Sequence, residues 1–253
     1  MPWKIKRRYR ALLSREEGCI TKPSGGKTKV ALIYPNMYHI GMSNLGFQII
    51  YKLLNRDPQI VCERAFLPEV DEIELLEKQR AHIFSLESLT PLDQFHILAF
   101  SVTFENDCLN LLKILELAGI PLRREERESY NFPLVLAGGV VPSFNPEPLA
   151  EFIDAFIIGE GEEPIQKLIP AFKEMPGSGR EATLERISTI KGVYIPAGYR
   201  PQYDSTGRVQ NYTPEKGYPE KVEKRFLKDL DKYPASSVML SPNTEFGNMF
   251  LVE

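Results

Sequence analysis

The chain has 253 residues, of which 43% are apolar and 26% are charged, and its net charge is −3. This composition is typical of a folded globular protein and excludes a disordered one; the length suits a domain of about 100–200 residues with an additional segment. The acidic balance disfavours a general nucleic-acid binder, which normally carries a basic excess. No apolar run of about 20 residues is present, and the basic N-terminus lacks the apolar stretch of a signal peptide. We therefore expect a cytoplasmic chain with no membrane partner.

Cysteine and histidine are too dispersed to form a recognisable metal or disulfide pattern. No two cysteines form a CxxC pair, which disfavours both a disulfide framework and a zinc site. We predict no metal site. His39 is either an axial metal ligand or a half-buried loop residue, and we favour the loop residue. The six residues of these two types are Cys19, Cys62, Cys108, His39, His82 and His96.

The first 28 residues are polar, and Lys4 to Arg10 are mostly basic. Such a segment is either an arm that binds nucleic acid or an acidic partner, or a solvated terminus that frays. We favour the frayed terminus and treat residues 1–28 as an N-terminal arm.

Five apolar runs alternate with segments of helical periodicity. The runs cover 29–34, 60–66, 96–102, 133–137 and 154–158, and the helices are expected over 44–56, 69–80, 105–118 and 162–175. Near-continuous apolar runs are typical of strands buried on both faces, and their alternation with helices predicts an α/β fold with a doubly wound, mainly parallel sheet. We also expect a short edge strand over 82–86, and an apolar face on the 105–118 helix that includes Leu109.

The character of the chain changes after residue 176. Met175 to Arg180 has the composition of a linker, and a short helix near 181–190, a strand over 193–196 and a Tyr- and Pro-rich stretch follow it. The sequence therefore predicts a small C-terminal α+β annex and a connector over 177–253.

Small and polar residues follow four of the predicted strands. In an open parallel sheet, ligands bind outside the carboxyl ends of the strands, where glycines permit close approach and helix N-termini offer amide donors. No GxGxxG fingerprint, phosphate-binding loop or Ser-His-Asp arrangement is present. The acidic run Glu160 to Glu163 is either an acid/base group or a complement to a helix dipole, and we favour the dipole.

Two consecutive segments carry a family resemblance. Gly138-Gly-Val-Val-Pro-Ser-Phe-Asn-Pro-Glu147, followed by Asp154-Ala-Phe-Ile-Ile-Gly-Glu-Gly-Glu-Glu163, resembles the cobalamin-binding-type N-terminal domain of radical S-adenosylmethionine (SAM) enzymes. The segment from Tyr34 to Gln48 is similar to the opening of a bacterial branch of that family. The resemblance covers residues 29–176 strongly and the rest loosely.

The resemblance implies a flavodoxin-like sheet of five parallel strands over 29–176. It also implies that a radical SAM barrel follows in the same polypeptide, holding the iron–sulfur cluster and SAM that this chain lacks. Residues 177–253 would connect the two domains, and the barrel would be the partner of this chain. Alone, the chain is expected to have no catalytic residues of its own and no radical chemistry.

The resemblance further implies that the loops at the carboxyl edge hold cobalamin, which would be presented to the iron–sulfur barrel. The family's D-x-H-x-x-G pattern fails here at Met37 and Met42, so any bound cobalamin would lack a protein histidine ligand. The alternative is a cobalamin-free module of the same fold that recognises a substrate or partner; a flavin-binding protein is a weaker third reading. The candidate cofactor-binding residues are Asn36, Ser43, Asn44, Gly46, Thr103, Phe104, Glu105, Gly138, Gly139, Pro142, Ser143, Gly159, Glu160 and Gly161.

Overall fold

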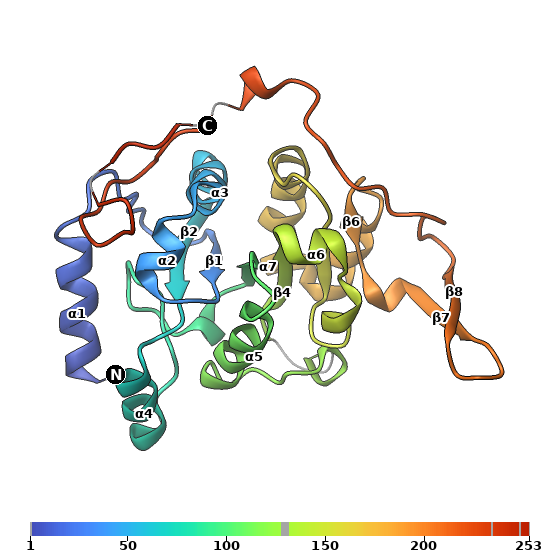
Figure 1. Cartoon of the computed structure of the whole chain (residues 1–253), viewed down its shortest axis with the longest axis horizontal. Coiled ribbons are helices and arrows are strands. Elements are labelled where there is room, and N and C mark those ends of the chain that lie inside the picture. The colour runs from blue at the N-terminus through green and yellow to red at the C-terminus, as the bar shows by residue number, and fades with distance from the viewer. Residues whose placement is uncertain (1, 128–131, 234, 248, 253) are drawn as a thin grey trace.

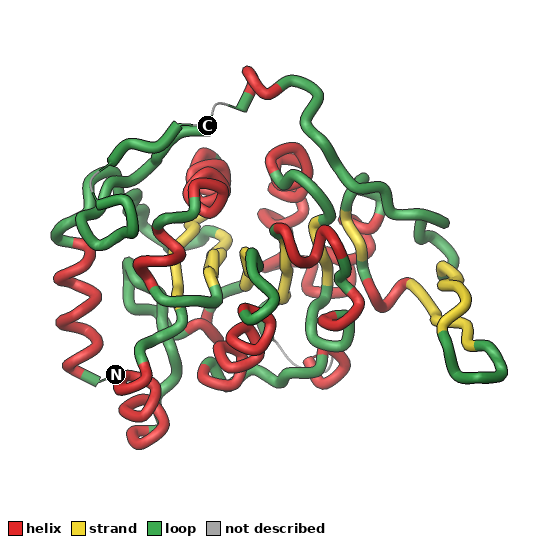
Figure 2. Tube along the Cα trace, in the orientation of Figure 1, coloured by secondary structure: helices red, strands yellow, loops and turns green. Residues whose placement is uncertain are grey.

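A six-stranded sheet forms the centre of the computed structural model, which describes residues 2–127, 132–233, 235–247 and 249–252 (Figures 1 and 2). The strand order is β2-β1-β3-β4-β5-β6, and all neighbours are parallel except β5 and β6. The first five strands thus have the order 2-1-3-4-5 of flavodoxin-like sheets, with a switch point between β1 and β3. The strands are β1 (Thr28–Tyr34), β2 (Ile60–Phe66), β3 (Ile97–Ser101), β4 (Leu134–Gly138), β5 (Ala155–Ile157) and β6 (Val193–Tyr194).

Helices cover both faces of this sheet. On one face α3 (Leu45–Arg56) and the first part of α7 (Glu162–Ser188) lie side by side, and on the other lie α4 (Val70–Gln79) and α5 (Asp107–Leu117) (Figure 1). The remaining helices are α1 (Trp3–Leu13), α2 (Tyr38–Met42), α6 (Val140–Phe144) and 3₁₀ turns at Leu92–Gln94, Arg124–Arg127, Glu147–Leu149, Pro196–Gly198 and Leu230–Lys232.

Both ends of α3 are fixed by side chains. At its start, the Asn44 side chain accepts a hydrogen bond from the backbone N–H of Phe47, which satisfies one of the free amides of the first turn. At its end, the Lys22 ammonium donates to the carbonyl oxygens of Asn55, Asp57 and Ile60. Helix α3 is therefore held in place on the sheet from both ends.

The expectation of a frayed N-terminus is wrong. Residues 3–13 form helix α1, in which Ile5 and Tyr9 are buried. The Tyr9 ring meets the Phe84 ring edge-on, with 5.3 Å between centroids. Apolar residues at i and i+4 give the helix a face to bury, which a basic tail lacks.

Beyond α1, the buried guanidinium of Arg64 anchors the N-terminal segment to the edge of the sheet. Arg64 lies on β2 and makes ion pairs of 2.6 Å with Glu16 and 2.7 Å with Glu87, and all three side chains are at most 4% exposed. The Tyr38 hydroxyl donates to Glu16 (2.6 Å) and lies 3.0 Å from the Ser241 hydroxyl. Segments from both ends of the chain thus meet at β2.

The C-terminal part departs from the predicted annex in two ways. Helix α7 continues through the predicted linker at 175–180, with a break in helical geometry only at Gly179 (φ +80°). The strand predicted over 193–196 is β6. It pairs antiparallel with β5 at the edge of the main sheet, which therefore has six strands. The hairpin of β7 (Tyr199–Tyr203) and β8 (Val209–Pro214) forms a separate two-stranded sheet (Figure 2).

Two smaller expectations are also corrected. Residues 82–86 form no strand; Phe84 makes a single bridge to Pro91. Leu109 is 74% exposed, because the buried face of α5 is formed by Leu111, Ile114 and Leu115 instead. Within the part of the chain that the structure describes, no helix is long and apolar enough to cross a membrane.

Candidate cofactor-binding site

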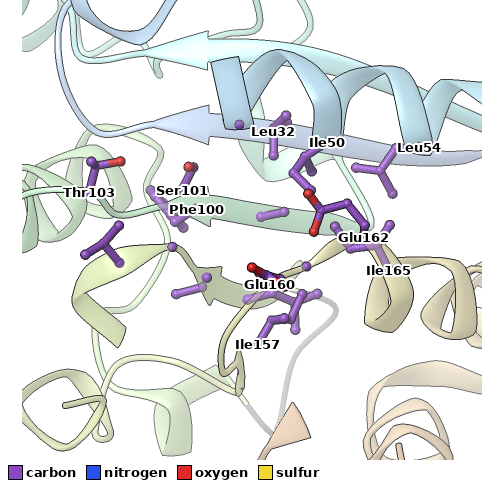
Figure 3. Close-up of a pocket in the computed structure, with 18 of the residues that line it drawn as sticks. Leu32, Ile50, Leu54, Phe100, Ser101, Thr103, Ile157, Glu160, Glu162 and Ile165 are labelled. Atoms are coloured by element: carbon purple, nitrogen blue, oxygen red, sulfur yellow. The ribbon is translucent and has the colours of Figure 1, made fainter. Parts of the chain in front are cut away.

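A cavity of about 500 Å³ opens at the carboxyl edge of the sheet, between α3 and α7 (Figure 3). It spans the switch point between β1 and β3, where ligands bind in open α/β sheets. Its lining comprises Leu32, Asn44, Leu45, Gly46, Ile50, Leu54, Ala99, Phe100, Ser101, Thr103, Leu136, Ala137, Gly138, Gly139, Val140, Ile157, Gly159, Glu160, Gly161, Glu162, Ile165, Leu168 and Phe172.

Small side chains on the central strands create the floor of this cavity. Strand pairing places Leu32, Ala99 and Leu136 in one row, and Ser101 beside Gly138 in a second row nearer the carboxyl edge. Residues in register on adjacent strands share a face of the sheet. Ala99, Ser101 and Gly138 are half-buried although they lie on central strands, because neither helix fills the space above them.

The walls of the cavity are apolar. Ile50 and Leu54 of α3 face Ile165 of α7 across the opening (Figure 3). Leu168 and Phe172 of α7 also line the cavity. A concave, mostly apolar space of this size, with a few polar groups at its mouth, is typical of small-molecule and cofactor sites.

The polar groups lie at the mouth. Ser101 and Thr103 come from the end of β3, and the Glu160 and Glu162 side chains are at the opposite rim (Figure 3). Burial raises the pKa of the nearby Tyr34 phenol, which lies beneath the mouth rather than in the cavity lining. These groups can orient a ligand by hydrogen bonds; they do not form an acid/base pair.

Gly139 has a structural function. Its φ is +109°, and a Cβ there would lie 2.5 Å from the carbonyl oxygen of Val102. The Ser143 hydroxyl donates to the carbonyl of Gly139 (2.7 Å) and accepts from the N–H of Gly159 (2.8 Å), which ties the β4 and β5 loops together. Gly138 has room for a side chain, since the nearest atom to its Cβ would be 3.5 Å away, on Ile157.

The loop after β5 is braced by the connector. The Arg225 N–H donates to the carbonyl of Ile158 (2.9 Å), and the Glu160 N–H donates to the carbonyl of Arg225 (3.1 Å). The Arg225 guanidinium pairs with Glu163 at 2.7 Å, and this hydrogen bond lowers the pKa of the Glu163 carboxyl. The Glu160 carboxylate accepts from the N–H of Leu227. The acidic run therefore serves mainly to fix the connector along the rim.

The structure brings eight of the fourteen predicted residues together around the cavity and places six elsewhere. Those that line it are Asn44, Gly46, Thr103, Gly138, Gly139, Gly159, Glu160 and Gly161. Those that do not are Asn36, Ser43, Phe104, Glu105, Pro142 and Ser143.

The six residues outside the lining have other surroundings. Asn36 donates to Asp107 (3.0 Å), and Ser43 donates to the carbonyl of His39 and accepts from the N–H of Glu245. Phe104 and Glu105 are exposed, and Pro142 is buried within α6. All six follow strands at the carboxyl edge of the sheet, but the segments there also make contacts away from the cavity.

His39 points away from the cavity. Its Nε2 lies 3.4 Å from a carboxylate oxygen of Glu245, and no histidine or cysteine is among the lining residues. Among the described residues, no three His, Cys, Asp or Glu side chains cluster as metal ligands would.

The sequence interpretation missed the apolar walls and floor. Ile50, Leu54, Ile165 and Leu168 fit the helical periodicity of core residues, and nothing in that pattern separates a residue that lines a cavity from one that packs. The available signal was the small residues on the central strands, Ala99 among them, where buried sheets normally carry Val, Ile or Leu.

A family model described as "Radical SAM proteins, N-terminal" matches residues 46–196. The chain belongs to this family. The matched region of the radical SAM N-terminal domain includes β3, β4, β5 and the part of α7 that forms the cavity wall.

Two individual proteins resemble this radical SAM N-terminal domain. An uncharacterized protein of Methanocaldococcus jannaschii is 25% identical over 229 residues, covering 88% of this chain and 37% of its own length. The chain thus spans little more than a third of that relative. The radical SAM methyltransferase TsrM from Kitasatospora setae, solved with tryptophan and a SAM analogue, has a TM-score of 0.43 and 19% identity. It aligns over 78% of this chain and 36% of its own.

Proposed function

We propose that this chain is a cofactor-binding module of the cobalamin type within a radical SAM enzyme. In this proposal, the carboxyl edge of the sheet holds a corrinoid and presents it to an iron–sulfur barrel elsewhere in the same polypeptide, where SAM also binds. The observation that carries the proposal is the cavity between α3 and α7 over the small residues of β3 and β4. Membership of the radical SAM N-terminal family supports the enzyme class.

The residues present are compatible with a corrinoid. The flat macrocycle of a corrinoid needs an open floor, and Ala99 and Gly138 provide it. Ser101, Thr103 and Asn44 offer hydrogen bonds at the mouth, where a ligand with amide side chains would need partners. Because no histidine lines the cavity, this chain would supply no imidazole to the cobalt. When bound, the corrinoid would supply the chemistry of a methyl carrier, while the protein binds and orients it.

A titration of the chain with hydroxocobalamin, followed by calorimetry and by the visible spectrum, tests the proposal. We expect saturable one-to-one binding. Ala99→Phe places a ring in the cavity and should weaken binding at least tenfold. Leu109→Ala, at an exposed position on the opposite face of the sheet, is the matched control and should bind normally. His39→Ala should leave the spectrum of the bound corrinoid unchanged.

Absence of binding at tens of micromolar, or equal binding by Ala99→Phe and the parent chain, would contradict the proposal. Gly139 is unsuitable for this test. Because its φ is positive, a substitution there would strain the backbone and disturb folding as well as binding.

A cobalamin-free recognition module is the second candidate, and one observation favours it. Phe144 is 80% exposed and Phe226 is 63% exposed, and the Lys224 ammonium lies 5.1 and 5.5 Å from their ring centroids. Exposed aromatic side chains at the carboxyl edge are suited to contact with a substrate or another domain. Absence of corrinoid binding, together with loss of the full-length protein's activity in Phe144→Ser, would support this function instead.

A further inference from the structure

Helix α1 presents a basic stripe with an exposed tryptophan. Trp3, Arg7, Arg10 and Ser14 recur at spacings of four, three and four residues, which places them on one side of a helix that turns by about 100° per residue. Trp3 is 65% exposed, and the other three are exposed as well. The stripe is directly opposite the buried face of the helix.

Among the residues that the structure describes, no carboxylate pairs with the cations on this side of α1. Lys4 and Arg8, on the flank of α1 that meets α4, pair with Asp71, Glu69 and Glu72. Neither Arg7 nor Arg10, nor the half-buried Lys6 beside them, makes an ion pair with any carboxylate that the structure describes. Helix α1 itself contains no acidic residue.

The helix that carries this positive surface is anchored to the rest of the protein. Arg8 makes a 2.8 Å ion pair with Glu72, whose side chain is 2% exposed, and Tyr9 is buried against Phe84. A ligand of the stripe would therefore incur little cost in ordering the helix. Because the apolar face of α1 is already packed against the protein, the helix cannot insert that face into a lipid surface.

We propose that the stripe on α1 (Trp3, Arg7, Arg10 and Ser14), together with the adjoining half-buried Lys6, binds single-stranded nucleic acid. Guanidinium and ammonium groups neutralise successive phosphates, and the exposed indole offers a ring on which a base stacks. The net charge of −3 describes the whole chain, whereas these cations are gathered on one helix at the β2 end of the sheet (Figure 1). The stripe is independent of the cavity and of the corrinoid proposal.

Contacts of Lys6, Arg7 and Arg10 with three phosphates would make the affinity depend on salt concentration in a characteristic way. Each contact with a single strand contributes a slope of about −0.7 in a plot of log K against log salt concentration, so the total slope is about −2. Binding should then weaken by about 20-fold between 50 and 200 mM salt.

Trp3 is the only tryptophan of the chain, so its fluorescence reports directly on stacking. The probes are mixed-sequence 12-nucleotide RNA and DNA, added to the full chain, with affinity also measured by anisotropy of the labelled strand. We expect quenching of Trp3 fluorescence and the salt slope given above. A preference for RNA over DNA would identify RNA as the natural ligand. Arg7→Gln with Arg10→Gln should weaken binding about tenfold, and Trp3→Leu should do so to a similar extent.

The control double variant is Lys191→Gln with Lys221→Gln, which removes two exposed lysines near β6 and should leave binding unchanged. Because all these positions are exposed, the circular dichroism spectra should match that of the parent. The inference is overturned by unquenched Trp3 at 100 µM oligonucleotide, by unchanged affinity in the Arg7 and Arg10 variant, or by tighter binding to phosphatidylglycerol vesicles than to either strand.

Discussion

Beneath α3 and α7, the half of the sheet formed by β1 and β2 is filled with large side chains, whereas the half formed by β3 and β4 is hollow. Tyr34, Arg64 and Phe66 occupy the filled half, together with Phe47 and Tyr51 of α3, and none is more than 3% exposed. In the hollow half, the equivalent strand positions are Ala99, Ser101, Leu136 and Gly138, three of which carry small side chains. Since α3 and α7 cover both halves, the size of the strand side chains decides where a cavity forms.

The largest loss in the free energy of unfolding is expected for a substitution in the filled half. Arg64→Met removes the cation between Glu16 and Glu87 and leaves two buried carboxylates unpaired. Removing one partner of a buried ion pair costs about 3–5 kcal/mol. Urea denaturation should show a loss of that size in the free energy of unfolding; a loss below about 1 kcal/mol would show that the cluster contributes little to holding the N-terminal segment on β2.

The next largest loss of stability is expected at one of two adjacent glycines at the rim of the hollow half. Gly139→Ala forces a Cβ into a backbone conformation that only glycine adopts and against the carbonyl of Val102, at a cost of about 2–3 kcal/mol. Gly138→Ala meets only an ordinary contact with Ile157 and should change stability by less than about 1 kcal/mol. Thermal unfolding of the two variants checks this, and equal losses would contradict the structural function assigned to Gly139.

The third comparison uses two alanines on neighbouring strands. Ala31 is fully buried and lies in register with Leu98, on the opposite face of the sheet from Ala99. Ala31→Leu overpacks a filled core and should cost about 1–3 kcal/mol. Ala99→Leu extends into the cavity, so its cost should be below about 1 kcal/mol. Similar losses for both variants in urea denaturation would mean that the cavity does not exist in solution.

The five parallel strands and their helices could be predicted, because long apolar runs such as 96–102 and a capped periodic segment such as 44–56 are strong local signals. Helix α1 was missed because its basic residues obscured the apolar spacing of Ile5 and Tyr9. The second half of α7 was missed because Pro176 and the glycines after it have the composition of a linker, although the helix is interrupted only at Gly179.

From the sequence, the candidate site could be located only to the carboxyl edge of the sheet. Loop residues such as Gly138 and Glu160 could be assigned to that edge from strand order alone. Which of them face a cavity depends on side-chain volumes across strands and on the distance between α3 and α7. Neither is encoded in a local pattern, so Ile50 and Ile165 could not be separated from core residues.

Hydrogen exchange of the chain with and without hydroxocobalamin tests the central claim that the hollow half is the ligand site. We predict slower exchange at 44–46, 138–140 and 159–162, the segments that surround the cavity mouth, and no change across β2 in the filled half. Protection confined to other segments, or no protection at corrinoid concentrations that saturate binding, would contradict the account.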